Sequence, residues 1–264
     1  MKKIILLITI ISISVSISAQ EKGKSKREER REKRKEKVDA LVKQEEEGAI
    51  VNKKHFVAGA KLTTDGYGFF VEKGLAQTVS RTLLFQLDIA ERKSPKEAKQ
   101  FSLRGVGPYI YGKVNYFYPV KLGLQQQFLL GNKGNKNGVS VTANIGGGIS
   151  LGLLRPYLLG FDSAGATIFK GPGNSVSDTM KFLGQDLISG PSLGTGFNKL
   201  KVTPGAYVKA GLRFDYGKYN EVVSAIEVGV SAEFYTKKIT QMLYTKERNF
   251  YFSAYVTLIG GKRK

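Results

Sequence analysis

Residues 202–217, VTPGAYVKAGLRFDYG, alternate between two kinds of side chain. Every second residue, from the first valine to the last tyrosine, is apolar. The residues between them include Lys209, Arg213 and Asp215, which carry charges of both signs. A period of two over this length predicts a β-strand with one apolar face and one polar face.

The same alternation recurs along most of the chain. Asp65 and Gly66 separate two alternating runs, and Asp-Gly is a strong β-hairpin signal, although a bulge within one longer strand would also fit. With the hairpin, the sequence predicts eight strands, an even number that suits a single-chain bacterial barrel. Their expected ranges are 56–64, 67–74, 81–91, 114–130, 138–160, 199–217, 221–236 and 248–261.

Several of these runs are longer than an ordinary strand of about 5–6 residues. A tilted strand needs roughly 9–11 residues to cross a bilayer. The apolar face is aliphatic in mid-strand and aromatic toward the ends, for example at Phe214, Tyr216, Phe250 and Phe252. This pattern is typical of outer-membrane barrels, whose aromatic girdles flank an aliphatic band. We therefore expect an all-β fold, a closed antiparallel transmembrane β-barrel; a soluble barrel of the lipocalin type fits the strand lengths less well.

The connections between the expected strands differ in length according to the side of the barrel. If the N-terminus is periplasmic, the periplasmic turns are short and the outer connections are long, as barrels of this kind require. The short turns are 75–80, 131–137 and 218–220, and the long connections are 92–113, 161–198 and 237–247.

The N-terminal part of the chain has a different composition. Two lysines followed by an apolar run predict a secretory signal peptide over residues 1–19. Residues 20–54 are rich in Lys, Arg and Glu, and we expect a charged, basic periplasmic arm there, disordered or helical. It is either a solvated tail or an arm that touches anionic lipid or an acidic partner. Residues 55–264 form the expected barrel.

The net charge of +20 does not indicate a nucleic-acid partner, because an exported chain does not meet nucleic acid.

The polar strand faces predict the content of the barrel interior. Eight strands enclose a space just wide enough for side chains, and an unpaired charge there costs several kcal/mol. We expect a mutually satisfied polar network that plugs the lumen; a proton or small-ion path remains the alternative. The expected members are Asp88, Lys121, Gln125, Lys209, Arg213, Asp215, Glu227 and Glu233. The other residues expected to face inward are Gln127, Asn144, Tyr207, Tyr235, Tyr251 and Tyr255.

Catalytic residues are not expected. Small outer-membrane enzymes that act on lipids use a Ser activated by a His, and His55, the only histidine, comes just before the first expected strand. We expect it to be a solvated residue at the barrel rim. Glu227 and Glu233 are about 20 Å apart along one strand, too far to act on one bond. The sequence also shows no spacing typical of a cofactor or metal site.

The outer connection at 161–198 carries local sequence signals. A short helix with Met180, Phe182 and Leu183 on its apolar side is expected within it. Long loops with local structure are usually functional or act as lids. This loop is therefore either a lid over the barrel mouth or an extracellular docking surface.

Three stretches carry a resemblance to known proteins: QQQFLLGNKGNKNGVSV (125–141), GGGISLGLLRPY (146–157) and RFDYGKYNEVVSAIEVG (213–229). They resemble small eight-stranded outer-membrane β-barrel proteins of Gram-negative bacteria and an uncharacterised outer-membrane barrel-domain family. The resemblance implies the fold and the location and brings no catalytic residues. The chain departs from the common pattern in closing with TLIGGKRK, without a terminal aromatic residue.

Three classes of function remain open. The first is a structural or docking component of the cell envelope, which acts through its outer loops and its basic arm. The second is a narrow channel or an accessory of a transport or secretion complex, and the third is a lipid-modifying enzyme. The expected partners are outer-membrane lipid and, if the loops dock, another envelope protein.

Overall fold

The computed structural model describes residues 30–32, 34–35, 54–78, 80–100, 108–133, 138–163, 166–171, 187–189, 194–218 and 221–263. The chain divides into two compact units, Met1–Ile50 and Val51–Lys264. In the first unit, residues 30–32 and 34–35 are helical. The expected signal peptide and most of the expected arm lie outside the described residues. None of the helical residues described belongs to a helix long and apolar enough to cross a membrane.

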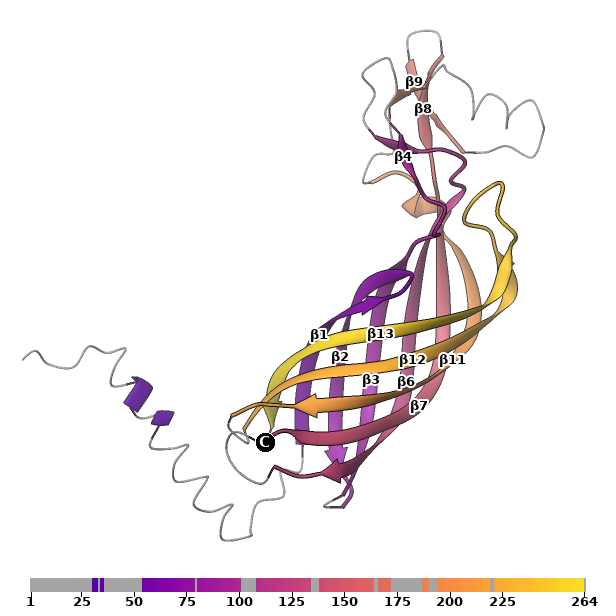
Figure 1. The fold of residues 1–264 in the computed structure, drawn as a ribbon. Helices are drawn as coiled ribbons and strands as arrows, with labels where there is room; N and C mark the ends of the chain where they lie inside the picture. The colour runs from indigo at the N-terminus through magenta and orange to yellow at the C-terminus, as the bar shows by residue number, and fades with distance from the viewer. Residues whose placement is uncertain are drawn as a thin grey trace, which may run out of the picture. The chain divides into compact units, whose positions relative to one another are not determined.

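Eight strands of the second unit form a closed antiparallel barrel (Figure 1). Their order around the wall is β1-β13-β12-β11-β7-β6-β3-β2. The predicted eight-stranded, all-β barrel is thereby confirmed. The strands are β1 (Lys54–Thr63), β2 (Gly66–Ala76), β3 (Arg81–Arg92), β6 (Asn115–Gly131), β7 (Ser140–Pro156), β11 (Lys201–Asp215), β12 (Val222–Ile239) and β13 (Arg248–Arg263).

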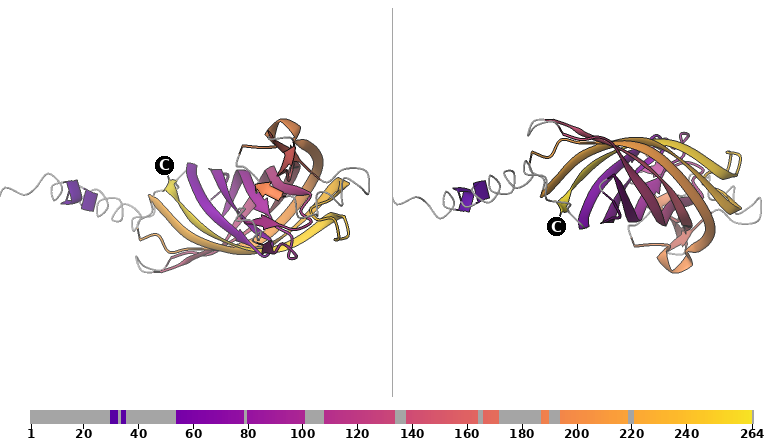
Figure 2. Two further views of the ribbon diagram at one scale, coloured as in Figure 1. Left: turned by 90° about the horizontal axis from the view of Figure 1, so that it is seen from above. Right: turned by 90° about the horizontal axis from the view of Figure 1, so that it is seen from below.

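The two ends of the barrel differ in their connections. At the turn end, β1 begins at Lys54, β13 ends at Arg263, and β2 joins β3 by a short turn. At the loop end lie the long connections β3–β6, β7–β11 and β12–β13. The hairpin predicted at Asp65 and Gly66 is confirmed, because Thr63 pairs with Gly66 and β1 lies antiparallel to β2. Figure 2 shows the wall of tilted strands from two opposite sides.

Further short strands lie beyond the loop end (Figure 1). A three-stranded sheet has the order β10-β8-β9, and β4 pairs with β5. The strand predicted over 138–160 is too long at its C-terminal end, because β7 ends at Pro156 and Leu159 starts β8 of the separate sheet. The elements of the loop end are β4 (Lys99–Gln100), β5 (Tyr109–Ile110), β8 (Leu159–Ser163), β9 (Ala166–Lys170), β10 (Leu187–Ser189) and the 3₁₀ helix η1 (Phe197–Lys199).

One apolar cluster attaches these connections to the barrel. Tyr157 and Leu159 are almost fully buried and pack against residues of β5, β6 and the β12–β13 connection. The backbone N–H of Ile110 donates a hydrogen bond of 2.8 Å to the hydroxyl of Tyr157. Tyr116 is half-buried in this cluster, with its ring centroid 5.4 Å from that of Tyr157.

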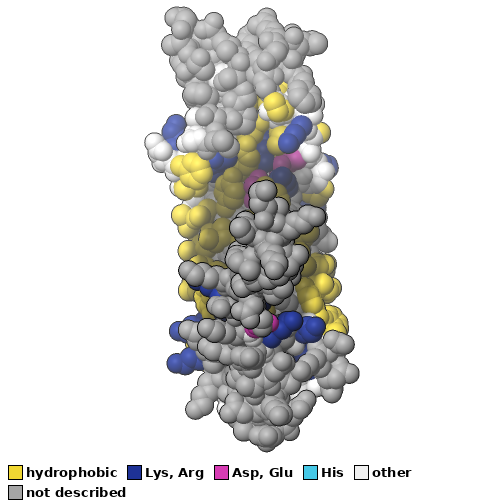
Figure 3. All heavy atoms as spheres, turned by 90° about the vertical axis from the view of Figure 1, so that its left-hand side faces the viewer, with side chains coloured by type: hydrophobic (Ala, Val, Ile, Leu, Met, Phe, Trp, Pro, Cys, Tyr) yellow, Lys and Arg dark blue, Asp and Glu magenta, His cyan; other side chains and the backbone are white. Residues whose placement is uncertain are grey.

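The outer face of the barrel is apolar. Val208 of β11 is 62% exposed and Ile149 of β7 is 58% exposed, whereas the charged Lys209 and Arg213 of β11 are buried. The two faces predicted for residues 202–217 are therefore confirmed, with the apolar face outside. Figure 3 shows the apolar side chains on one side of the wall, with Lys and Arg gathered at the two ends of the apolar zone.

Candidate functional site

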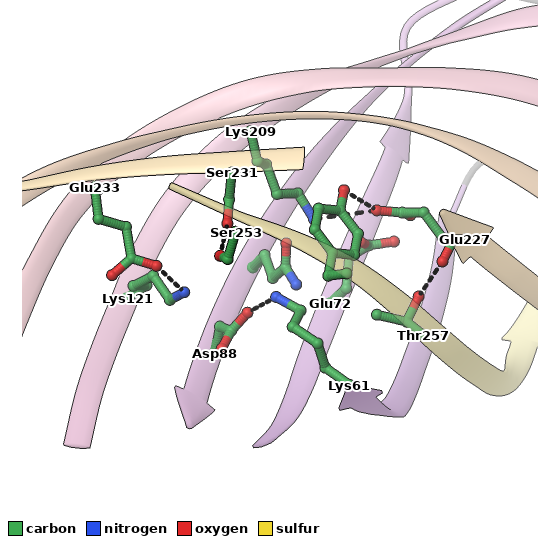
Figure 4. Close-up of polar contacts among 12 residues, drawn as sticks. Lys61, Glu72, Asp88, Lys121, Lys209, Glu227, Ser231, Glu233, Ser253 and Thr257 are labelled. Atoms are coloured by element: carbon green, nitrogen blue, oxygen red, sulfur yellow. Dashed lines mark hydrogen bonds and ion pairs between the residues drawn. The ribbon is translucent and has the colours of Figure 1, made fainter. Parts of the chain in front are cut away.

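Charged and polar side chains fill the barrel interior, which makes it the candidate site. The eight predicted members of the polar network are all buried, including both glutamates of β12. Figure 4 shows several of them spread along the interior, projecting from different strands toward one another. They are Asp88, Lys121, Gln125, Lys209, Arg213, Asp215, Glu227 and Glu233.

Arg213 links two glutamates from different strands. Its guanidinium donates to both carboxylate oxygens of Glu72, at 2.8 and 2.9 Å. Its Nε donates to Oε2 of Glu227 at 2.8 Å. Bidentate contacts of this kind are among the stronger hydrogen bonds in proteins because both partners are charged and the geometry matches. Arg213 therefore ties β2, β11 and β12 together across the interior.

Glu227 is the most heavily bonded carboxylate of the interior. Besides Arg213, it accepts hydrogen bonds from Asn144 Nδ2 at 2.7 Å and from the hydroxyl of Tyr255 at 2.8 Å. Lys209 Nζ lies 3.3 Å from its Oε1. These partners come from β7, β11 and β13, so one side chain of β12 satisfies donors from three other strands. Such a carboxylate is stabilised in its ionised form by its surroundings.

A second group lies around Glu233 of the same strand. Lys121 and Arg92 donate to Glu233 Oε1 at 2.7 and 2.9 Å, and the hydroxyl of Tyr235 donates to Oε2 at 2.8 Å. Arg92 also forms an ion pair of 2.9 Å with Asp65 of the β1–β2 hairpin. This group connects the interior to the loop end.

Two further pairs lie between these groups. Lys61 of β1 is ion-paired with Asp88 of β3, and Gln125 of β6 donates a hydrogen bond to Gln86 of β3. We call the residues joined by all these contacts the interior network: Lys61, Glu72, Gln86, Asp88, Arg92, Lys121, Gln125, Asn144, Lys209, Arg213, Glu227, Glu233, Tyr235 and Tyr255.

Apolar clusters lie on both sides of the interior network. Toward the turn end, Val57 and Phe70 pack with buried residues of β12 and β13. Toward the loop end, Phe117 packs with Tyr235 and Ile239, and its ring meets that of Tyr235 edge-on at 5.4 Å between centroids. The charged groups are therefore confined between apolar layers, where an unpaired charge would be costly.

Two residues differ in place from what the sequence suggested. His55 is not a solvated rim residue: its side chain is only 13% exposed, and its Nε2 lies 3.6 Å from Glu72 Oε1. Asp215 is buried, but its ion-pair partners are Arg263 and Lys133 at the turn end, so it lies outside the interior network.

The sequence interpretation missed four members of the interior network: Lys61, Glu72, Gln86 and Arg92. The signal for the first two was present, because Lys61 falls between the apolar positions of its strand and Glu72 follows the outward-facing Val71. Their partners could not be read from the sequence. Glu72 and Arg213 are 141 positions apart and meet only because the barrel closes.

Inward-facing glycines make room for the tyrosines of the network. A Cβ on Gly211 or on Gly229 would lie 2.6 Å from the hydroxyl oxygen of Tyr255. Glycine at both positions therefore lets the Tyr255 hydroxyl reach Glu227.

The chemistry open to this arrangement is that of a closed ion-pair network. Each cation of the network has a carboxylate within ion-pair distance, and Glu227 and Glu233 belong to separate groups. Within the described residues, no group of His, Cys, Asp and Glu is suited to hold a metal ion. The candidate docking residues Met180, Phe182 and Leu183 lie outside the described residues.

A closed barrel with an apolar outer face and a charged, filled interior is a membrane-spanning β-barrel of the outer-membrane type.

No family model and no curated protein matches the chain. Among solved structures, the chain is similar to the N-terminal β-barrel domain of Pseudomonas aeruginosa OprF, with 8% identity and a TM-score of 0.35 over 80% of this chain and 98% of that one. It is similar to Neisserial surface protein A, with 12% identity and a TM-score of 0.33 over 80% and 93%. It is also similar to Ail, the attachment invasion locus protein of Yersinia pestis, with 11% identity and a TM-score of 0.37 over 81% and 100%.

Proposed function

We propose that this chain is an integral protein of the outer membrane and a structural or docking component of the cell envelope. In this proposal the turn end and the N-terminal arm face the periplasm, and the loop end faces outward. The observation that carries the proposal is the filled interior: charged side chains paired from opposite walls lie between two apolar clusters. Such a barrel serves as an anchor for what its ends present.

The interior network supports this role over a channel. Conduction needs ion sites that are weak enough to release the ion, whereas Glu227 and Glu233 are each held by several donors from the protein itself. The same contacts support a role without catalysis, because a carboxylate bonded to cations is a poor general base.

The loop end is the part available for docking. It carries two small sheets outside the barrel wall, and the cluster around Tyr157 and Leu159 joins them to the strands. Tyr244 of the β12–β13 connection is 69% exposed. An extension of this kind presents surface to a partner while the barrel holds it at the membrane. The partner in this proposal is another envelope protein.

Bilayer recordings test the anchoring role. The purified full chain in planar bilayers is expected to show no stable conductance, because paired charged side chains and apolar clusters occupy the interior. Reproducible ion-selective openings that change in Arg213→Gln would contradict the anchoring role and favour the channel.

Site-directed labelling tests the orientation, since the chain has no cysteine of its own. Tyr244→Cys at the loop end and Lys218→Cys at the turn end each create a single thiol. On intact cells, a membrane-impermeant maleimide is expected to label Tyr244→Cys, and to label Lys218→Cys only after permeabilisation. The reverse pattern would show that the barrel is inserted the other way.

A further inference from the structure

Three lysines gather on the outer face where the two ends of the barrel sequence meet. Phe56 of β1 pairs with Lys73 of β2 on one side and with Lys262 of β13 on the other. Lys54 lies two residues before Phe56 and therefore on the same face. All three lysines are exposed, and Phe56 is 58% exposed. We call these four residues the lysine seam.

The spacing of the lysine seam suits one phosphate group. Neighbouring strands lie about 4.8 Å apart, so the Cα atoms of Lys73 and Lys262 are about 10 Å apart across Phe56. A lysine stem is long and flexible, and its ammonium can extend away from an apolar surface. The ammonium groups of Lys73 and Lys262 can therefore approach a single anion from both sides, and Lys54 lies closer to the turn end.

Within the described residues, no ion pair neutralises the charges of Lys73 and Lys262. Of the nearby carboxylates, Glu72 is bonded to Arg213 and Asp215 is paired with Arg263, while the exposed Glu221 precedes Val222, the residue that pairs with Lys262. Three lysines therefore face one exposed carboxylate. The seam therefore presents a net positive surface at the edge of the apolar band.

The outer surface next to the lysine seam, toward the middle of the wall, is apolar. The next outward-facing row consists of Ala58, which pairs with Val71 of β2 and with Gly260 of β13. A Cβ placed on Gly260 would meet no atom within 4 Å, so this part of the wall is open. An anionic head next to lysines and an apolar chain along small residues is the chemistry of a phospholipid, not that of a soluble anion.

We infer that the lysine seam is a binding site for a diacyl phospholipid with an anionic headgroup. Lys73 and Lys262 hold the phosphate, Lys54 adds positive charge on the water side, and the acyl chains lie against Phe56, Ala58 and Gly260. The inference rests on the membrane location proposed above. It adds a lipid preference at one defined place on the wall.

Native mass spectrometry of the full chain tests this site. The protein is purified in detergent, mixed with equal amounts of phosphatidylglycerol and phosphatidylcholine, and scored for retained lipid. Retention of phosphatidylglycerol is expected to exceed that of phosphatidylcholine. It is expected to fall about thirtyfold in the double variant K73Q/K262Q, because each lysine near an anionic membrane surface contributes about fivefold.

Two matched variants serve as controls. K237Q/K238Q removes the same charge from exposed lysines at the loop end and is expected to leave retention unchanged. K73R/K262R keeps the charge and is expected to retain the lipid. Equal retention of both lipids by the natural chain would overturn the inference, and so would undiminished retention of phosphatidylglycerol by K73Q/K262Q. The inference would also be overturned if K73Q/K262Q lost a co-purifying protein and kept the lipid.

Vesicle insertion separates failure of this site from failure of the proposed function. A barrel that does not insert into vesicles of any composition would contradict the membrane location itself. A barrel that inserts fully but shows no preference for phosphatidylglycerol would overturn only the lipid site.

Discussion

Glu227 illustrates how single side chains hold this barrel together. It lies on β12 and accepts hydrogen bonds from side chains of β7, β11 and β13. Removal of one partner from a buried charged pair is strongly destabilising, because it leaves the other charge unpaired. The interior network should therefore respond to the loss of one charge far more than the exposed rim does.

Glu227→Gln is expected to lower the free energy of unfolding by about 3–5 kcal/mol. The substitution keeps the size of the side chain but leaves Lys209 without its carboxylate, whereas Arg213 keeps Glu72. The measurement is denaturant unfolding of the folded barrel, followed by circular dichroism.

Two further variants make this result specific. Glu221→Gln, an exposed change just before β12, is expected to have little effect. Lys209→Gln combined with Glu227→Gln is expected to recover part of the loss, because it removes the orphaned charge. A single Glu227→Gln barrel as stable as the natural one would show that the network contributes little.

The alternation of side chains indicated which residues face inward but not which of them are in contact. Lys209 and Arg213 could be placed on the polar face of one strand from the sequence alone. The contacts with Glu227 lie within the β11–β12 hairpin, in which Arg213 and Glu227 pair directly. The contact of Arg213 with Glu72 depends on barrel closure, which brings together residues 141 positions apart. The position of His55 beside Glu72 was missed because the alternation that predicted the first strand starts only at Phe56, whereas β1 starts at Lys54.

Strands and connections differ in how much of them the sequence revealed. The barrel strands were predictable because lipid on one side and a narrow lumen on the other force a period of two on every strand. The short strands β4, β5, β8, β9 and β10 were not predicted. They pair outside the wall, so no lipid contact imposes alternation on them.

Tyr157 makes the attachment of these connections sensitive to alkaline pH. Burial raises the pKa of its hydroxyl from 10.0 to about 12, and the N–H of Ile110 opposes this only in part. The folded state thus holds this proton more tightly than the unfolded state does. The resulting stabilisation is fully present below pH 10 and is lost as the pH rises from 10 to about 12.

The pH dependence can be isolated by comparing the natural chain with Tyr157→Phe. The difference in denaturant midpoint between the two proteins is expected to be constant below pH 10. The midpoint of the natural chain should then fall relative to that of Tyr157→Phe as the pH rises from 10 to about 12. Other titrating groups are common to both proteins and cancel in the difference. Parallel curves from pH 8 to 12 would exclude a contribution from Tyr157.

As a whole, the barrel closes upon itself through the pairing of β1 with β13, so that every strand of the wall lies within residues 54–263. In the described part of the barrel the exterior is apolar and the interior is charged and paired, and the exposed lysines Lys73, Lys237 and Lys262 lie toward the ends of their strands. In the proposed function these surfaces have different roles: the wall contacts lipid, the interior network holds the strands together, and the ends are available for contacts.

Removal of residues 21–48 is expected to leave the barrel folded, because this tract has almost no apolar residues to contribute to a core. Any effect should appear as weaker association with anionic vesicles or with an acidic partner. Because attraction between exposed charges is screened within about 8 Å at physiological salt, the difference between full-length and truncated chains should shrink as salt rises.

Co-sedimentation with anionic vesicles and co-purification of partners, each at low and high salt, measure this difference. The lysine seam is present in both chains, so binding that depends on it cancels in the comparison. Equal binding of both chains at low salt would identify the tract as a solvated tail. A truncated chain that fails to fold would instead assign it a structural role, contrary to what its composition predicts.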